Sequence, residues 1–157
     1  MEKIKSVLFV CTGNSCRSVM AEALLKKYLK AAGKESITVG SAGTGTFDGM
    51  PPTNETIDVL KGEGIELTGF RSKVLNAKII KEADLILAME DMHRDIIVRM
   101  APEAAAKTHL LKEFGNPGPR DHEEGASVPD PVGRPVEFYK YVINMIKKEI
   151  GRIAELL

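Results

Sequence analysis

The hydrophobic positions of this chain follow two alternating patterns, short apolar runs and longer stretches with apolar residues three and four positions apart. Short apolar runs bounded by turn residues are typical of buried strands, and spacings of three and four are typical of helices that pack on them. We predict strands at about Ser6–Val10, Ile37–Gly40, Leu85–Met89 and His109–Leu111, and helices at about Val19–Ala32, Thr53–Glu63, Met92–Met100 and Pro135–Leu157.

This alternation predicts an α/β fold, an open four-stranded parallel sheet with helices on both faces. No internal repeat, low-complexity tract or linker interrupts the pattern, so residues 1–157 are expected to form a single domain. In such sheets, ligands bind outside the carboxyl ends of the strands. The loops that follow the predicted strands are therefore where we expect the chemistry.

Composition and charge limit the range of functions. With 43% hydrophobic and 28% charged residues, the sequence is typical of a soluble globular protein. The 22 Lys and Arg residues balance the 22 Asp and Glu residues, and no apolar run is long enough for a membrane span or a signal peptide. We expect a cytoplasmic protein that binds neither nucleic acid nor membrane. Two cysteines, Cys11 and Cys16, are too few for a disulfide framework or a zinc site.

The stretch from Val7 to Ala21 has the clearest chemical pattern, a strand, a short Gly/Asn/Ser loop and a helix start. A strand-to-helix loop directs several backbone N–H groups at one point, where the helix dipole also favours an anion. A thiol at this point, Cys11, ionises readily, and Arg17 has the planar fork that fits two oxygens of a tetrahedral anion. Gly13 and Asn14 tolerate left-handed backbone, and Ser18 can donate a hydrogen bond to the Cys11 sulfur.

Three other interpretations of this loop are weaker. A cysteine at the end of a buried strand is often only a small core residue, but it would not require the surrounding Gly, Asn, Ser and Arg. A nucleotide-binding P-loop would require Gly-Lys-Ser/Thr, and no lysine follows Gly13. The glycines from Gly43 to Gly49 lack the spacing of a dinucleotide fingerprint.

The run from Cys11 to Ser18, CTGNSCRS, together with the strand before it and the MAEAL continuation, resembles the low-molecular-weight protein tyrosine phosphatase family. The resemblance implies a Rossmann-like three-layer fold and a phosphatase that forms a cysteinyl-phosphate without cofactor or metal. It also implies that Ser41 supports Asn14, and that Cys16 forms a reversible disulfide with Cys11 on oxidation. The alternative for Cys16 is an inert packed thiol. The phosphate-binding residues that it implies are Thr12, Gly13, Asn14, Ser15, Cys16, Arg17 and Ser18.

The second half of the expected site lies in the long loop at 115–134, where Asp130 stands between two prolines. Asp130 resembles the general acid of this family, and the chemistry requires such a group because the leaving oxygen must be protonated. Asp-Pro alone is a common turn signature, so the assignment depends on the N-terminal loop. An alternative acidic source is the group Asp121, Glu123 and Glu124, which we interpret as solvated loop charge.

The substrate is the least determined feature of the sequence. Tyrosine-selective members commonly have two aromatic residues after the Asp-Pro, which help to wall the phenyl ring, whereas this chain has Val132 and Gly133. Phe47 is a candidate for one wall of that cleft. Protein arginine phosphatases resemble the chain too, with threonine at the position of Ser15. The first prediction is hydrolysis of phosphotyrosine in a phosphorylated protein or peptide by a monomer, and phosphoarginine is the second.

Two further alternative functions are weaker. Thioredoxin-coupled arsenate reductases share the loop but need further cysteines, and an anion-binding protein without catalysis would need no acid.

Phe70 stands where many family members have a histidine, which alters the expected network behind the loop. Asp91 is expected to cap a helix, and Arg71 and Lys73 to form a solvated basic edge. We expect no chemistry from His93 on a helix surface, from His109 in a strand or from His122 in a loop.

Overall fold

The computed structural model describes residues 3–116 and 125–157. Four parallel strands form one sheet in the order β2-β1-β3-β4, with β1 between β2 and β3. The strands are β1 (Ser6–Cys11), β2 (Thr38–Gly43), β3 (Leu85–Ala88) and β4 (Thr108–Leu110). The predicted α/β class and the parallel four-stranded sheet are confirmed.

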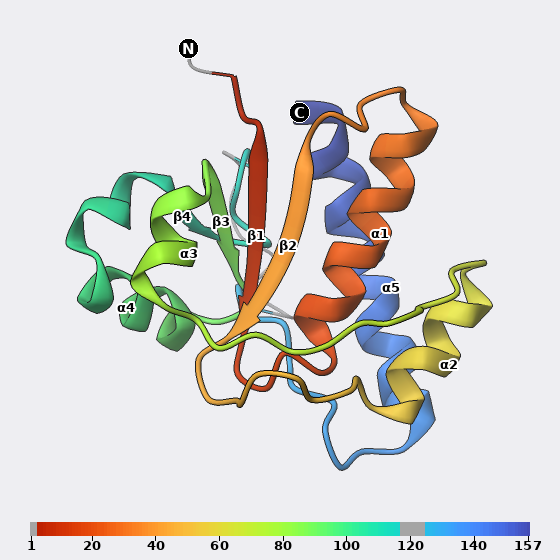
Figure 1. Ribbon diagram of the computed structural model, residues 1–157. Coiled ribbons are helices and arrows are strands. Elements are labelled where there is room, and N and C mark those ends of the chain that lie inside the picture. Colours follow the sequence, from red (N-terminus) through yellow and green to blue (C-terminus); the bar gives the residue numbers. More distant parts are fainter. Residues whose placement is uncertain (1–2, 117–124) are drawn as a thin grey trace.

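Helices cover both faces of this sheet, as Figure 1 shows. Along β1, Val7 and Phe9 face the core beneath α1 and α5, while Leu8 and Val10 face the core beneath α3 and α4. This follows from the two-residue period of a strand, which sends successive side chains to opposite faces. The helices are α1 (Arg17–Ala31), α2 (Asn54–Gly62), α3 (Ala77–Glu82), α4 (Asp91–Met100), the 3-10 helix η1 (Pro102–Lys107) and α5 (Val136–Leu156).

The boundaries differ from the sequence prediction in a few places. Strand β2 continues to Gly43, so Ser41 lies within it, and α1 already begins at Arg17. Helices α3 and η1 were not predicted, because six residues are too few to show a helical period. Asp91 is not the cap of α4 as expected; it is the first helical residue, and Glu90 caps the helix.

The carboxyl ends of β1, β2 and β3 lie at one edge of the sheet, where the loops after them meet (Figure 1). The loop after β1 leads into α1, the loop after β2 leads toward α2, and β3 ends just before Glu90. The sheet therefore brings together segments that are about 80 residues apart in sequence. Within residues 3–116 and 125–157, no helix is both long and apolar enough to cross a membrane.

Candidate active site

The loop after β1 takes its shape from a buried asparagine in an unusual backbone conformation. Asn14 has φ 49° and is fully buried, and it is the only non-glycine residue with positive φ in the described parts of the chain. Asparagine tolerates this conformation better than most residues because its short polar side chain can bond locally. The loop reverses direction at Asn14 and enters α1 at Arg17. The first N–H groups of α1 therefore point into the space that the loop surrounds.

Three contacts determine which way the Asn14 amide points. The backbone N–H of Lys73 donates to Asn14 Oδ1 at 2.9 Å, so the amide nitrogen faces the other way. That nitrogen donates to Ser18 Oγ at 2.8 Å and to Ser41 Oγ at 2.9 Å. Ser41 in turn donates to Glu22 Oε1 at 2.7 Å. The contact expected between Ser41 and Asn14 is thus present, although the backbone of Lys73 and the carboxylate of Glu22 were not predicted to take part.

The hydroxyl of Ser18 is oriented by this arrangement. Ser18 Oγ lies 2.9 Å from Cys11 Sγ. Because Ser18 already accepts a hydrogen bond from Asn14, its own hydrogen is free to point at the sulfur. A donor aimed at Sγ stabilises the negatively charged form of a thiol relative to the neutral one. The contact that the sequence suggested between these two residues is therefore present and suited to a thiolate.

Strand β2 approaches the loop closely at Gly43. A Cβ atom built on Gly43 would lie 2.5 Å from the carbonyl oxygen of Thr12, far inside contact distance. Just beyond it, the N–H of Thr44 donates to the Cys11 carbonyl and the N–H of Gly45 donates to the Thr12 carbonyl, both at 2.9 Å. Glycine is thus required at position 43 for the backbone of β2 to reach the loop.

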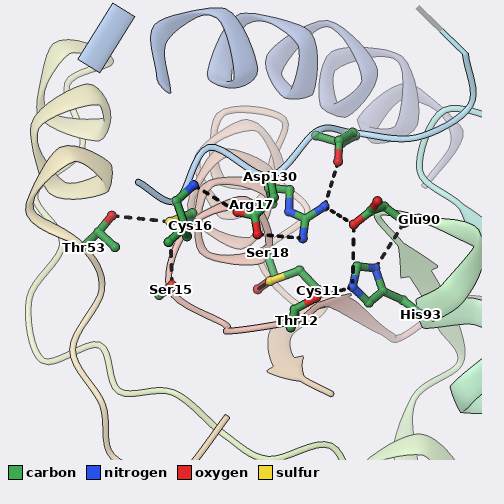
Figure 2. A network of polar contacts seen from close by, with 12 residues as sticks. Cys11, Thr12, Ser15, Cys16, Arg17, Ser18, Thr53, Glu90, His93 and Asp130 are labelled. Atoms are coloured by element: carbon green, nitrogen blue, oxygen red, sulfur yellow. Dashed lines mark hydrogen bonds and ion pairs between the residues drawn. The ribbon is translucent and has the colours of Figure 1, made fainter. Parts of the chain in front are cut away.

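Arg17 is buried and held from behind. Its exposed fraction is 2%, and its Nη1 donates to Glu90 Oε2 at 2.6 Å and to the Val128 carbonyl at 2.7 Å, contacts drawn in Figure 2. Glu90 was not among the residues predicted from the sequence. The rule that ligands bind beyond the carboxyl ends of parallel strands could have indicated it, because Glu90 follows β3 directly.

His93 was expected on a helix surface without chemistry, and this prediction of its location is wrong. Its side chain is completely buried. The ring Nδ1 accepts the N–H of Glu90 at 3.1 Å, so Nε2 carries the hydrogen and donates to Thr12 Oγ1 at 2.8 Å. Burial and the neighbouring Arg17 charge lower the pKa of His93 to about 4, so the ring is neutral at physiological pH. His93 therefore links the start of α4 to the loop after β1 (Figure 2).

Asp130 lies at the rim of the same site. A cavity of about 220 Å³ is lined by Cys11, Arg17, Asp130 and Val132 together with Thr12, Gly13, Ser15 and Cys16. Asp130 is 49% exposed; its Oδ2 lies 3.9 Å from Arg17 Nη2, and its Oδ1 accepts the N–H of Val132 at 3.0 Å. The structure thus brings the expected nucleophile, cation and acid into one cavity. Phe47, a candidate wall, is 79% exposed and does not line this cavity.

Cys16 is buried at the end of the same loop, and its sulfur lies among hydroxyl groups. Its sulfur lies 3.4 Å from Thr53 Oγ1 and 3.6 Å from both Ser15 Oγ and the Tyr139 hydroxyl. Burial raises the pKa of Tyr139 to about 12, so its phenol stays protonated. Both cysteines are free thiols. The disulfide between Cys16 and Cys11 stays a prediction.

The remaining expected residues lie away from this cavity. Phe70 is half-buried and packs against the core, so it makes no polar contact behind the loop. His109 is in β4 with its ring 5.2 Å from that of Phe114. The alternative acids Asp121, Glu123 and Glu124, and also His122, are outside the residues that the structure describes. Within the described ranges, no cluster of three His, Cys, Asp or Glu side chains is placed to hold a metal ion.

Comparison with known proteins gives the site its context. The family model for low molecular weight phosphotyrosine protein phosphatase matches residues 6–157. The chain belongs to this family. A protein-arginine-phosphatase from Geobacillus stearothermophilus is 40% identical over 96% of this chain and 95% of its own. The low molecular weight protein-tyrosine-phosphatase Etp from Escherichia coli strain K12 is 33% identical over 99% of this chain and 96% of its own.

Solved structures of the family agree with the fold. A YwlE arginine phosphatase mutant with a phosphorylated active-site serine has a TM-score of 0.87 and 30% sequence identity to this chain, and the match covers 97% of this chain and 95% of its own. As a low molecular weight phosphatase, the protein is an enzyme of the hydrolase class. The family resemblance inferred from the loop is therefore confirmed.

Proposed function

We propose that this low molecular weight phosphatase hydrolyses phosphotyrosine in proteins through a cysteinyl-phosphate intermediate. The observation that carries the proposal is the single cavity that joins Cys11, Arg17 and Asp130. Its walls include residues of the loop between β1 and α1. The backbone N–H groups of this loop and the N-terminus of α1 favour the binding of a tetrahedral anion. A nucleophile, a cation and an acid around one anion site are what phosphoryl transfer requires.

In the first step, the Cys11 thiolate attacks phosphorus. A sulfur–phosphorus bond forms while the bond from phosphorus to the tyrosine oxygen breaks, and the protonated Asp130 gives its proton to that oxygen. Arg17 pairs with two phosphoryl oxygens as charge develops on them. Glu90 and the Val128 carbonyl hold the guanidinium from behind, so it need not reorganise during the reaction.

In the second step, water hydrolyses the intermediate. Asp130, now a carboxylate, takes a proton from the water as its oxygen attacks phosphorus and the sulfur–phosphorus bond breaks. The products are inorganic phosphate and the Cys11 thiolate. The exposed position of Asp130 at the rim suits both tasks, because water and the leaving group arrive from that side.

The test combines two substitutions. Cys11→Ser should abolish turnover of para-nitrophenyl phosphate, and persistence of turnover would remove Cys11 from the mechanism. Asp130→Ala should slow hydrolysis of phenyl phosphate, a poor leaving group, by about 10²–10⁴-fold and that of para-nitrophenyl phosphate much less. Equal slowing of both substrates would show that Asp130 is not the acid.

Phosphoarginine is the second candidate substrate, and two observations favour it. The residues beyond Asp130 are Val132 and Gly133 instead of aromatic ones, and Val132 lines the cavity. The Asp130 carboxylate at the rim would also suit a guanidinium group. Comparing kcat/KM for one peptide that carries either phosphotyrosine or phosphoarginine decides between the two.

We infer a monomer in the cytoplasm, where a reducing environment keeps the free Cys11 thiol available. Cys16 serves as the redox partner that protects Cys11 from further oxidation. Peptide mapping after mild peroxide treatment tests this pairing, since a disulfide between Cys11 and Cys16 should form and should reverse with a thiol reductant.

A further inference from the structure

A second cavity, which we call the α1 cavity, is separate from the catalytic one. Its volume is about 650 Å³, and its walls come mainly from α1 and from the segment at 64–73. Figure 1 shows this segment, in yellow-green, running past α1. None of the residues that line the α1 cavity lines the one around Cys11. Ligand pockets of proteins span about 300–1,000 Å³, so the space is sufficient for a small organic molecule.

The floor of the α1 cavity is apolar. Ile65, Leu67 and Phe70 line it, and each is half-buried because it also packs against the core. Ala23 of α1 adds a small apolar side chain to the lining. A ligand with an apolar body would therefore remove apolar surface from water on both partners.

The rim of the α1 cavity is positively charged, because its basic residues outnumber its acidic ones. The basic residues are Lys26, Lys27, Lys30, Arg71 and Lys73, and the acidic residues are Glu22 and Glu66. The chain as a whole has a net charge of zero, so the positive excess is local to this cavity. A basic rim above an apolar floor attracts an anion.

The carboxylate of Glu22 does not oppose this attraction, because both of its oxygens are already bonded. Its Oε2 pairs with Lys26 Nζ at 2.8 Å, and its Oε1 accepts the Ser41 hydroxyl at 2.7 Å. Only 13% of the Glu22 side chain is exposed. An anion that enters the α1 cavity therefore meets a carboxylate whose charge is compensated.

Three cations of the rim have no acidic partner. Within residues 3–116 and 125–157, Lys30, Arg71 and Lys73 form no ion pair with a carboxylate. All three are exposed, and Arg71 Nη1 donates only to the neutral Phe70 carbonyl, at 2.7 Å. Lys30 is on α1 and the other two are on the segment at 64–73, so both walls of the cavity supply a cation.

We propose that the α1 cavity binds a small amphipathic carboxylate, and that the bound molecule strengthens the support of the phosphate loop. The apolar body of the ligand lies on Ile65 and Leu67, and its carboxylate pairs with the cations of the rim. Such a ligand contacts α1 and the segment at 64–73 together, so it stabilises the position in which the segment is docked.

The docked position of this segment also holds the phosphate loop. The backbone N–H of Lys73, in the cavity wall, donates to Asn14 Oδ1 at 2.9 Å. The carboxylate ligand and a phosphate in the loop therefore favour the same arrangement, and each should tighten the binding of the other. This second part of the proposal rests on the proposed function, in which the loop is the phosphate site.

The direct test uses 1-naphthoate, which combines an apolar ring system with one carboxylate. Isothermal titration calorimetry with the full-length protein should show saturable binding that weakens as salt is added. Orthovanadate is present at a saturating concentration, so that the catalytic cavity is occupied. 1-Naphthamide, which lacks the charge, and acetate, which lacks the rings, should each bind at least about fivefold more weakly.

Two double variants locate the binding. Lys30→Glu with Arg71→Glu reverses two charges of the rim and should weaken 1-naphthoate binding at least about tenfold. The matched variant Lys148→Glu with Arg99→Glu makes the same charge changes at exposed positions outside the cavity, and it should bind normally. Equal weakening in both variants would mean that net charge, and not the α1 cavity, attracts the ligand.

The link to the phosphate loop is measured separately. The Kd of orthovanadate should fall by about fivefold or more when 1-naphthoate is saturating, and the Kd of 1-naphthoate should fall by the same factor with orthovanadate. An unchanged Kd would refute the link, and displacement of 1-naphthoate by orthovanadate would place it in the catalytic cavity. Failure of orthovanadate to bind the protein alone would instead count against the proposed function, and equal binding of 1-naphthamide would refute the role of the cations.

Discussion

Replacing Gly43 by alanine should disable the catalytic loop without touching any group that reacts. The added Cβ would lie 2.5 Å from the Thr12 carbonyl oxygen and 2.8 Å from Thr46 Cγ2, whereas ordinary contact begins at 3.4 Å. The Thr12 oxygen must then move by 3.4 minus 2.5, or 0.9 Å, unless β2 itself moves. That oxygen accepts the N–H of Gly45, so the shift also strains a hydrogen bond of the loop.

The size of the effect follows from that displacement. A misplacement of about 1 Å near the reacting atoms can cost about 10²-fold in rate, so we expect kcat to fall by roughly that factor. Overpacking at this contact should also cost about 1–3 kcal/mol of unfolding free energy. Both quantities are measurable, the first with para-nitrophenyl phosphate and the second with urea unfolding.

Gly40→Ala is the matched control, because it makes the same change in the same strand. A Cβ on Gly40 meets nothing within 4 Å, so this variant should keep kcat within twofold of the parent. If Gly43→Ala also stays within twofold, the close approach of β2 does not position the loop. If it loses stability but keeps kcat, β2 moves instead of the Thr12 carbonyl, and the predicted fall in kcat is refuted.

Two further predictions concern the residues behind Arg17. Glu90→Gln should weaken inhibition by inorganic phosphate and lower the unfolding free energy by about 2 kcal/mol, because the buried Arg17 loses its charged partner. Asp91→Asn makes the same acid-to-amide change at an exposed neighbour and should cost less than about 1 kcal/mol of unfolding free energy. Equal losses in the two variants would contradict the assignment of Glu90 as the charged partner of Arg17. In the unfolded chain His93 is protonated below about pH 6.5, but in the fold only below about pH 4, so acidification across this range favours unfolding by up to roughly 3 kcal/mol. His93→Gln should flatten that part of the curve of stability against pH, and an unchanged slope would refute it.

The sequence contained enough information to predict the sheet and the phosphate loop. The loop is contiguous, and each of its residue types has a local physical reason: Asn14 for left-handed backbone, Ser18 for a donor within reach of Cys11. Strands β1 and β3 were equally accessible because a buried parallel strand is a short, almost wholly apolar run. These features depend on residues near one another in the chain.

The supports of the loop were harder to predict because they come from distant segments. Glu90 and His93 reach the site only because β3 lies next to β1. The residues that flank His93 in the sequence are mostly polar, as in a helix at the protein surface. The Lys73 contribution is a backbone N–H, which carries no signature in the sequence at all. Helix α3 was missed because its apolar residues, Ile79 and Ile80, are too few to define a period.

The three contacts of the Asn14 amide also constrain how the protein folds. Ser18 lies in the same segment as Asn14, but Ser41 and Lys73 belong to segments 27 and 59 residues further along the chain. A folding intermediate with only β1 and α1 would contain the full motif and still lack two of the contacts that fix it. Each of these pairings carries a loop-closure cost that grows with the separation of the two residues in sequence. Orientation of the Asn14 amide therefore requires β2 and the segment around Lys73 as well as the motif itself, and a fragment limited to β1 and α1 lacks it.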